Sequence, residues 1–81
     1  MTADSLQREI AKGWAMLVFQ YHGKEGHVDP YCTQDKDFSC LLWYDGNEKL
    51  VHSVYDVMNT PIFDGYSLAD ISADISGIDW C

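Results

Sequence analysis

An Asp-Gly pair between two apolar runs constrains the fold of this chain more than any other feature. The runs are Cys40–Tyr44 and Lys49–Val54, and Asp45-Gly46 lies in the short segment between them. Asp-Gly is favoured in the tight turn that joins two antiparallel strands, because both residues tolerate a positive φ. The sequence therefore predicts a β-hairpin with strands at 40–44 and 49–54.

A third strand and an N-terminal helix are predicted upstream of this hairpin. The run from Trp14 to Tyr21 is apolar and aromatic and is bounded by glycines, which favours a buried strand over a surface helix. No helical crossover separates the predicted strands, so we expect an antiparallel meander. Asp4 has the spacing of a helix start and Gly13 suits a helix end, which predicts a helix over 4–12.

Two Ser-x-x-Asp pairs predict helices in the C-terminal part. They match the capping box, and they favour a short helix near 54–58 and a longer one at 68–76. The pairs are Ser53 with Asp56 and Ser67 with Asp70. We therefore expect an α+β fold in which an N-terminal helix precedes a three-stranded antiparallel β-meander, with short C-terminal helices packed on one face. A chain of 81 residues cannot divide its apolar residues between two cores, so 1–81 is expected to form a single small globular domain.

The apolar pattern also predicts which side chains form the core. They are expected on one face of each predicted element. The set is Leu6, Ile10, Leu17, Phe19, Leu41, Trp43, Leu50, Val54, Leu68, Ile71 and Ile75. The segment from His22 to Ser39 is expected to be a long loop, because it contains Gly23, Gly26 and Pro30 and few apolar residues. Tyr31 and Phe38 leave open an irregular strand within it.

The charge of the chain restricts its partners. Thirteen acidic residues against five basic ones give a formal net charge of -8, which disfavours direct binding to nucleic-acid phosphates. No apolar run is long enough to span a membrane, and no basic and apolar leader opens the chain. Three cysteines are an odd count for a disulfide framework. We therefore expect a cytoplasmic protein with reduced thiols.

Histidine and cysteine side chains in the predicted loop raise the question of a metal or thiol site. The candidates are His22, His27, Cys32 and Cys40. The gaps between them are longer than those of zinc knuckles, and Cys40 opens an apolar strand, where it suits a small hydrophobe. No family-like nucleophile motif accompanies them. We expect no metal, no cofactor and no catalytic residue, and hence a protein that is not an enzyme.

The C-terminal stretch combines acidic and aromatic side chains and holds no Lys or Arg from residue 50 onward. Carboxylates steer a basic partner and aromatic rings anchor it, so this stretch is the predicted partner-binding surface. The predicted binding residues are Asp56, Asp64, Asp70, Asp74, Asp79, Tyr55, Phe63, Tyr66 and Trp80.

The expected function is that of a protein-binding inhibitor or modulator that occupies a basic, nucleic-acid-binding surface of a partner protein. In size and charge alone the chain resembles the inhibitors that phages and mobile elements encode, including anti-CRISPR proteins. No shared motif supports that resemblance. Two alternatives stay open: a metal- or thiol-dependent site on the 22–40 loop, and a structural subunit of an obligate oligomer, for example a homodimer.

Overall fold

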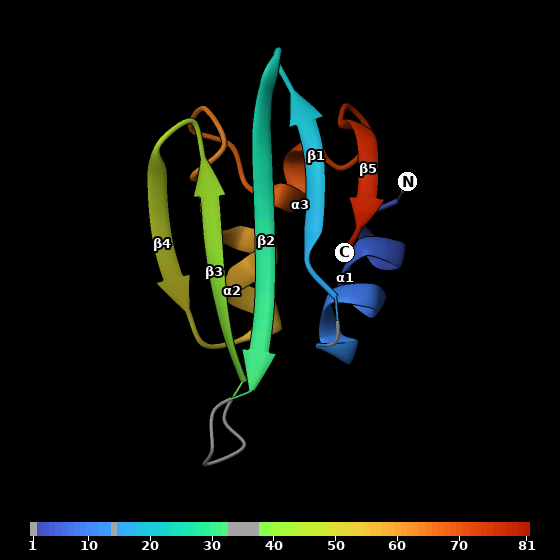
Figure 1. Cartoon of the computed structure of the whole chain (residues 1–81), viewed down its shortest axis with the longest axis vertical. Coiled ribbons are helices and arrows are strands. Elements are labelled where there is room, and N and C mark those ends of the chain that lie inside the picture. The colour runs from blue at the N-terminus through green and yellow to red at the C-terminus, as the bar shows by residue number, and fades with distance from the viewer. Residues whose placement is uncertain (1, 14, 33–37) are drawn as a thin grey trace.

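The computed structural model describes residues 2–13, 15–32 and 38–81, with the side chain of Cys32 left out, and these residues form one five-stranded antiparallel sheet in the order β4-β3-β2-β1-β5 (Figure 1). The strands are β1 (Leu17–Tyr21), β2 (Lys24–Cys32), β3 (Phe38–Tyr44), β4 (Asn47–Val51) and β5 (Ser76–Trp80). The helices of the described residues are α1 (Ala3–Lys12), α2 (Val54–Asn59) and α3 (Leu68–Ile71), and all of them lie on the same face of the sheet. The α+β class and the N-terminal helix are thus confirmed.

The predicted Asp45-Gly46 hairpin is present as β3 and β4, but the three-stranded meander is incomplete. The sheet has five strands, and β2 lies between β1 and β3. β2 occupies the first half of the segment that was expected to be a loop. Gly26 is a residue of this strand. A glycine is needed at this position because the ring of Phe19 on β1 occupies the space that a Cβ would need. Pro30 lies beyond Val28, the last residue of β2 that pairs with β1. At Pro30, β2 is therefore paired on one side only, with β3. Proline, which lacks an N–H, is tolerated at such edge-like positions of a sheet.

The predicted helix at 68–76 is also corrected. Ser67 and Asp70 form the expected capping box, but α3 ends at Ile71. The N–H of Asp74 donates to the carbonyl of Ile71 and closes a turn instead. The following residues form β5, whose Trp80 pairs with Leu17 of β1. Pairing with a strand that is distant in sequence overrides the local helical signal.

The core lies between the sheet and the three helices. Side chains alternate along each strand, and the buried apolar side chains of β3 are Cys40, Leu42 and Tyr44. The predicted core residues Leu41, Trp43 and Leu50 therefore lie on the opposite face, because a shift of one residue moves a side chain to the other side of a sheet. Leu6, Ile10, Leu17, Phe19, Leu68, Ile71 and Ile75 are buried as expected. Within the described ranges, no helix has the length and apolar character needed to cross a membrane.

Candidate functional site

Three tight turns lie together at one end of the sheet, which we call the turn end. Each has positive φ at both central residues, as type I′ turns require, and each has Gly in the second position. The pairs are His22-Gly23 between β1 and β2, Asp45-Gly46 between β3 and β4, and Asp64-Gly65 between the bridged residues Phe63 and Tyr66. In the described part of the chain, His22, Asp45 and Asp64 are the only residues other than glycine with positive φ.

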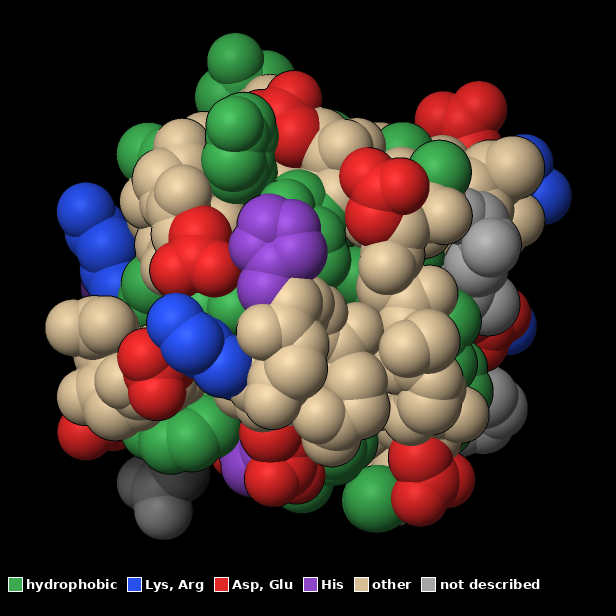
Figure 2. All heavy atoms as spheres, turned by 90° about the horizontal axis from the view of Figure 1, so that it is seen from above, with side chains coloured by type: hydrophobic (Ala, Val, Ile, Leu, Met, Phe, Trp, Pro, Cys, Tyr) green, Lys and Arg blue, Asp and Glu red, His purple; other side chains and the backbone are tan. Residues whose placement is uncertain are grey.

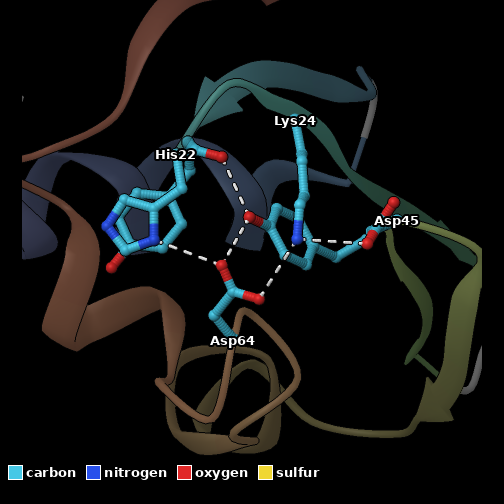
Figure 3. A network of polar contacts seen from close by, with 6 residues as sticks. His22, Lys24, Asp45 and Asp64 are labelled. Carbon is cyan, nitrogen blue, oxygen red and sulfur yellow. Dashed lines mark hydrogen bonds and ion pairs between the residues drawn. The ribbon is translucent and has the colours of Figure 1, made fainter.

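The Asp64 carboxylate connects these turns through a polar network (Figure 3). Its Oδ2 accepts a hydrogen bond from the Tyr44 hydroxyl at 2.9 Å and lies 3.2 Å from Nδ1 of His22. Its Oδ1 lies 3.7 Å from Nζ of Lys24, which in turn lies 3.2 Å from Oδ2 of Asp45. One residue from each turn thus takes part in a single network.

The environment of this network shifts the titration of its members. The hydrogen bond from Tyr44, followed by that from His22, lowers the pKa of Asp64. Burial, followed by the neighbouring Asp64 carboxylate, raises the pKa of Tyr44 to about 12. The Asp45 carboxylate raises the pKa of Lys24. Asp64 is therefore held as a carboxylate, and Tyr44 as a neutral hydrogen-bond donor.

A hollow of about 480 Å³ opens beside His22, and we call it the acidic hollow. It is lined by Tyr21, His22, Tyr66, Asp70, Ile71 and Asp74. The rings of Tyr21 and His22 stack with their centroids 3.8 Å apart. Tyr66 is 52% exposed, so a partner can reach much of its ring. Figure 2, which looks onto the turn end, shows a histidine near the centre with several acidic side chains and one basic side chain near it.

The acidic hollow carries a negative electrostatic field. Its lining residues include two carboxylates and no Lys or Arg. The pKa of Tyr21 is raised first by burial, and then by the charges of Asp74 and Asp64 and by Tyr66. Among the described residues, Asp70 and Asp74 form no ion pair, although Asp70 accepts a hydrogen bond from the backbone N–H of Ser67. A cationic group placed here would find two carboxylates that are not paired with a Lys or Arg side chain of the hollow.

The structure places the predicted binding residues in four locations. Tyr66, Asp70 and Asp74 line the acidic hollow, and Asp64 adjoins it through His22. Tyr55 and Asp56 lie on α2, while Asp79 and Trp80 lie on β5. Phe63 is removed from the predicted surface, because it is fully buried and packs edge-on against Phe19 at 5.5 Å between ring centroids.

Three of the four predicted metal candidates, His22, His27 and Cys40, lie apart from one another. His22 contacts Asp64 at the turn end, whereas His27 pairs with Trp43 on the face away from the helices. Cys40 is buried on the helix-covered face, where burial raises its thiol pKa to about 12. The side chain of Cys32 lies outside the described atoms. In the described ranges, no group of three His, Cys, Asp or Glu side chains is arranged to hold a metal ion.

Several residues of this site were not predicted for it. They are Tyr21, Lys24, Tyr44 and Asp45, and His22 was considered only for a metal- or thiol-dependent site. The available signal was the repetition of a polar residue followed by Gly, at 22–23, 45–46 and 64–65. Three such turns at one end of a sheet bring their first residues together. No protein-family model, no curated protein and no solved structure matches this chain.

Proposed function

We propose that this protein is a binding module, rather than an enzyme, and that it captures a basic surface of a partner protein at the acidic hollow. The observation that carries this proposal is the combination of a half-exposed tyrosine, Tyr66, with the carboxylates of Asp70 and Asp74 around one concave surface. Concave sites with an aromatic anchor and convergent charges are typical of binding hot spots.

The chemistry of the hollow suits a Lys or Arg side chain of the partner. The aliphatic part of such a side chain can pack on the Tyr66 ring, and its charged end can reach Asp70 or Asp74. The net charge of -8 would accelerate the encounter with a basic surface. A nucleic-acid-binding protein is the partner class that we propose, since carboxylates can occupy the positions of phosphates and so block that surface.

A capture experiment with charge-matched variants tests this proposal. The proteins offered for capture are the heparin-binding fraction of a cell lysate, which is rich in basic nucleic-acid-binding proteins. The hollow variant is Asp70→Asn with Asp74→Asn. The control is Asp4→Asn with Asp56→Asn, which removes the same charge from the first turns of α1 and α2. Proteins captured by each are compared by mass spectrometry, and melting temperatures verify that the variants are folded.

We expect the hollow variant to lose a specific captured protein and the control to retain it. With that partner purified, the loss should appear mainly as a slower association rate, and wild-type association should slow as salt rises. Equal loss in both variants would show that net charge alone drives capture. Undiminished capture by the hollow variant would exclude the acidic hollow as the binding site.

A further inference from the structure

The face of the sheet opposite the helices carries a patch of apolar side chains that no described element covers (Figure 1). We call it the uncovered face. Val18, Leu41 and Trp43 are only partly buried there, and Leu50 is 47% exposed. Leu41 pairs directly with Leu50, and Trp43 lies two residues along the same strand from Leu41. Leu41, Trp43 and Leu50 therefore form one continuous patch on β3 and β4, and Val18 lies beyond it on β1, across His27 of β2.

One cross-strand row shows how charge is placed on this face. It runs across all five strands as Asp79, Val18, His27, Trp43 and Glu48. The imidazole of His27 lies 4.9 Å from the Trp43 ring, between ring centroids, and its Nε2 lies 2.9 Å from the Glu25 carboxylate. The row thus has carboxylates at both edges of the sheet and aromatic and apolar groups between them.

Apart from His27, the titratable side chains of the acidic and basic residues on the uncovered face are carboxylates. Glu25 and Asp29 share it with Glu48 and Asp79, as the strand alternation and register show. The two lysines of the strands belong to the other side, since Lys24 pairs with Tyr21 and Lys49 pairs with Leu42. Within the described strands, no Lys or Arg side chain belongs to this face. An occupant that matches it needs apolar side chains flanked by positive charge.

We infer that the uncovered face is a second docking surface, which binds a basic amphipathic segment of a partner protein. A second copy of this chain fits less well, because it would bring two faces that carry carboxylates and no Lys or Arg against each other. The surface is apolar in its middle and acidic at its edges. A matching segment places Leu-like side chains on Trp43, Leu41 and Leu50 and directs Lys or Arg toward Asp79 and Glu48. The uncovered face and the acidic hollow share no residue, so each can bind independently of the other.

Titration with a synthetic amphipathic peptide of Leu and Lys tests the inference. Binding is followed by NMR chemical shifts of the backbone amides and by calorimetry. We expect shifts on β1, β3 and β4 around Val18, Trp43 and Leu50. Leu50→Ser should weaken the Kd about tenfold through lost apolar contact, and Glu48→Gln with Asp79→Asn should weaken it by a similar factor. The hollow variant removes the same charge and should bind the peptide as wild type does.

Several outcomes would overturn the inference. They are absence of peptide binding, shifts that map to the helices, and equal binding of a Leu and Glu peptide. Equal weakening by the hollow variant would also contradict it. A wild-type dimer in solution that Leu50→Ser converts to a monomer would assign the face to a second copy of the chain. Since the acidic hollow is tested by different variants, either surface can fail without the other.

Discussion

The phenolic oxygen of Tyr44 lies 2.9 Å from the Asp64 carboxylate and also 2.9 Å from the backbone carbonyl of Tyr21. A hydroxyl carries one proton, so Tyr44 donates to one of these acceptors at a time. The side chain is almost completely buried, and it links β3 both to the end of β1 and to the Asp64-Gly65 turn. This contact holds the parts of the turn end in a common arrangement.

Removing the Tyr44 hydroxyl should raise the pKa of Asp64 toward its ordinary value of 3.8. The hydrogen bond from Tyr44 is the largest cause of the lowered pKa, and that from His22 is the next. We therefore expect Tyr44→Phe to raise the pKa more than His22→Gln does. NMR titration of the Asp64 carboxyl carbon measures this pKa in the wild type, in Tyr44→Phe and in His22→Gln. The reverse order would contradict the role assigned to Tyr44.

The same shift makes folding stability depend on pH in the acid range. Because the folded-state pKa of Asp64 is lowered, the unfolded chain takes up the proton first as the pH falls. The stabilisation that the Asp64 carboxylate contributes is complete when the pH lies above the ordinary pKa of 3.8, and it is lost as the pH falls through the folded-state pKa. Free energies of unfolding between about pH 5 and pH 2 should therefore fall more steeply for wild type than for Asp64→Asn. Parallel curves would refute this contribution.

Gly26→Ala should destabilise the protein by about 1 to 3 kcal/mol, as overpacking of a core does. A Cβ at this position would lie 2.5 Å from Cζ of Phe19, whose ring is fully buried. Denaturant unfolding measures the change.

A second substitution separates this steric cause from a general loss of strand stability. Phe19→Leu shortens the side chain that meets the new methyl group. Gly26→Ala should cost less in the Phe19→Leu background than in wild type, which a double-mutant cycle measures as a coupling energy. Strict additivity would show that the ring is not the cause.

Leu17→Ala and Ile71→Ala should each destabilise the protein by about 2 to 5 kcal/mol. Both side chains are buried between the sheet and the helices. Leu50→Ala is the matched control, because Leu50 is a strand residue on the uncovered face, and it should cost less than about 1 kcal/mol. Urea denaturation of the three variants compares them. A similar loss for Leu50→Ala would mean that the uncovered face contributes to the core.

Cys81 should react with iodoacetamide much faster than Cys40 in the folded protein. Cys81 is exposed, whereas Cys40 is buried and burial raises its thiol pKa to about 12, so little reactive thiolate forms. Peptide mapping by mass spectrometry at about pH 8 follows both sites. In denaturant the two rates should converge, and early labelling of Cys40 in the folded state would contradict its burial.

Local signals in the sequence predicted the elements that depend on neighbouring residues. The Asp45-Gly46 hairpin and the caps at Ser53 and Ser67 are examples, because each needs only residues within a few positions. β2 was missed because Gly26 was interpreted as a strand breaker, although its missing side chain admits the Phe19 ring. β5 was missed because its pairing partner, β1, lies more than fifty residues earlier in the chain.

The candidate site was predicted in part, for the same reason. Asp70, Asp74 and Tyr66 were expected to belong together, and they line the acidic hollow. Their convergence with His22 depends on packing between the β1–β2 turn and the segment around α3, which no local pattern encodes. The uncovered face was missed by an error of one residue in register, since Leu41 and Trp43 were assigned to the core in place of Cys40 and Leu42.

In the three type I′ turns, the backbone requirement and the surface chemistry of the turn end fall on different residues. In each turn the glycine satisfies the backbone, and the preceding position takes residues that accept positive φ, such as Asp, Asn or His. Exchanges among these residues at 22 and 45 would alter the charge and hydrogen bonding of the turn end at little cost to the hairpins, whereas Asp64 is tied to the buried Tyr44 hydroxyl. Two separated positions could thus change the surface chemistry of the turn end on an unchanged scaffold, and they form a natural starting set for a combinatorial library.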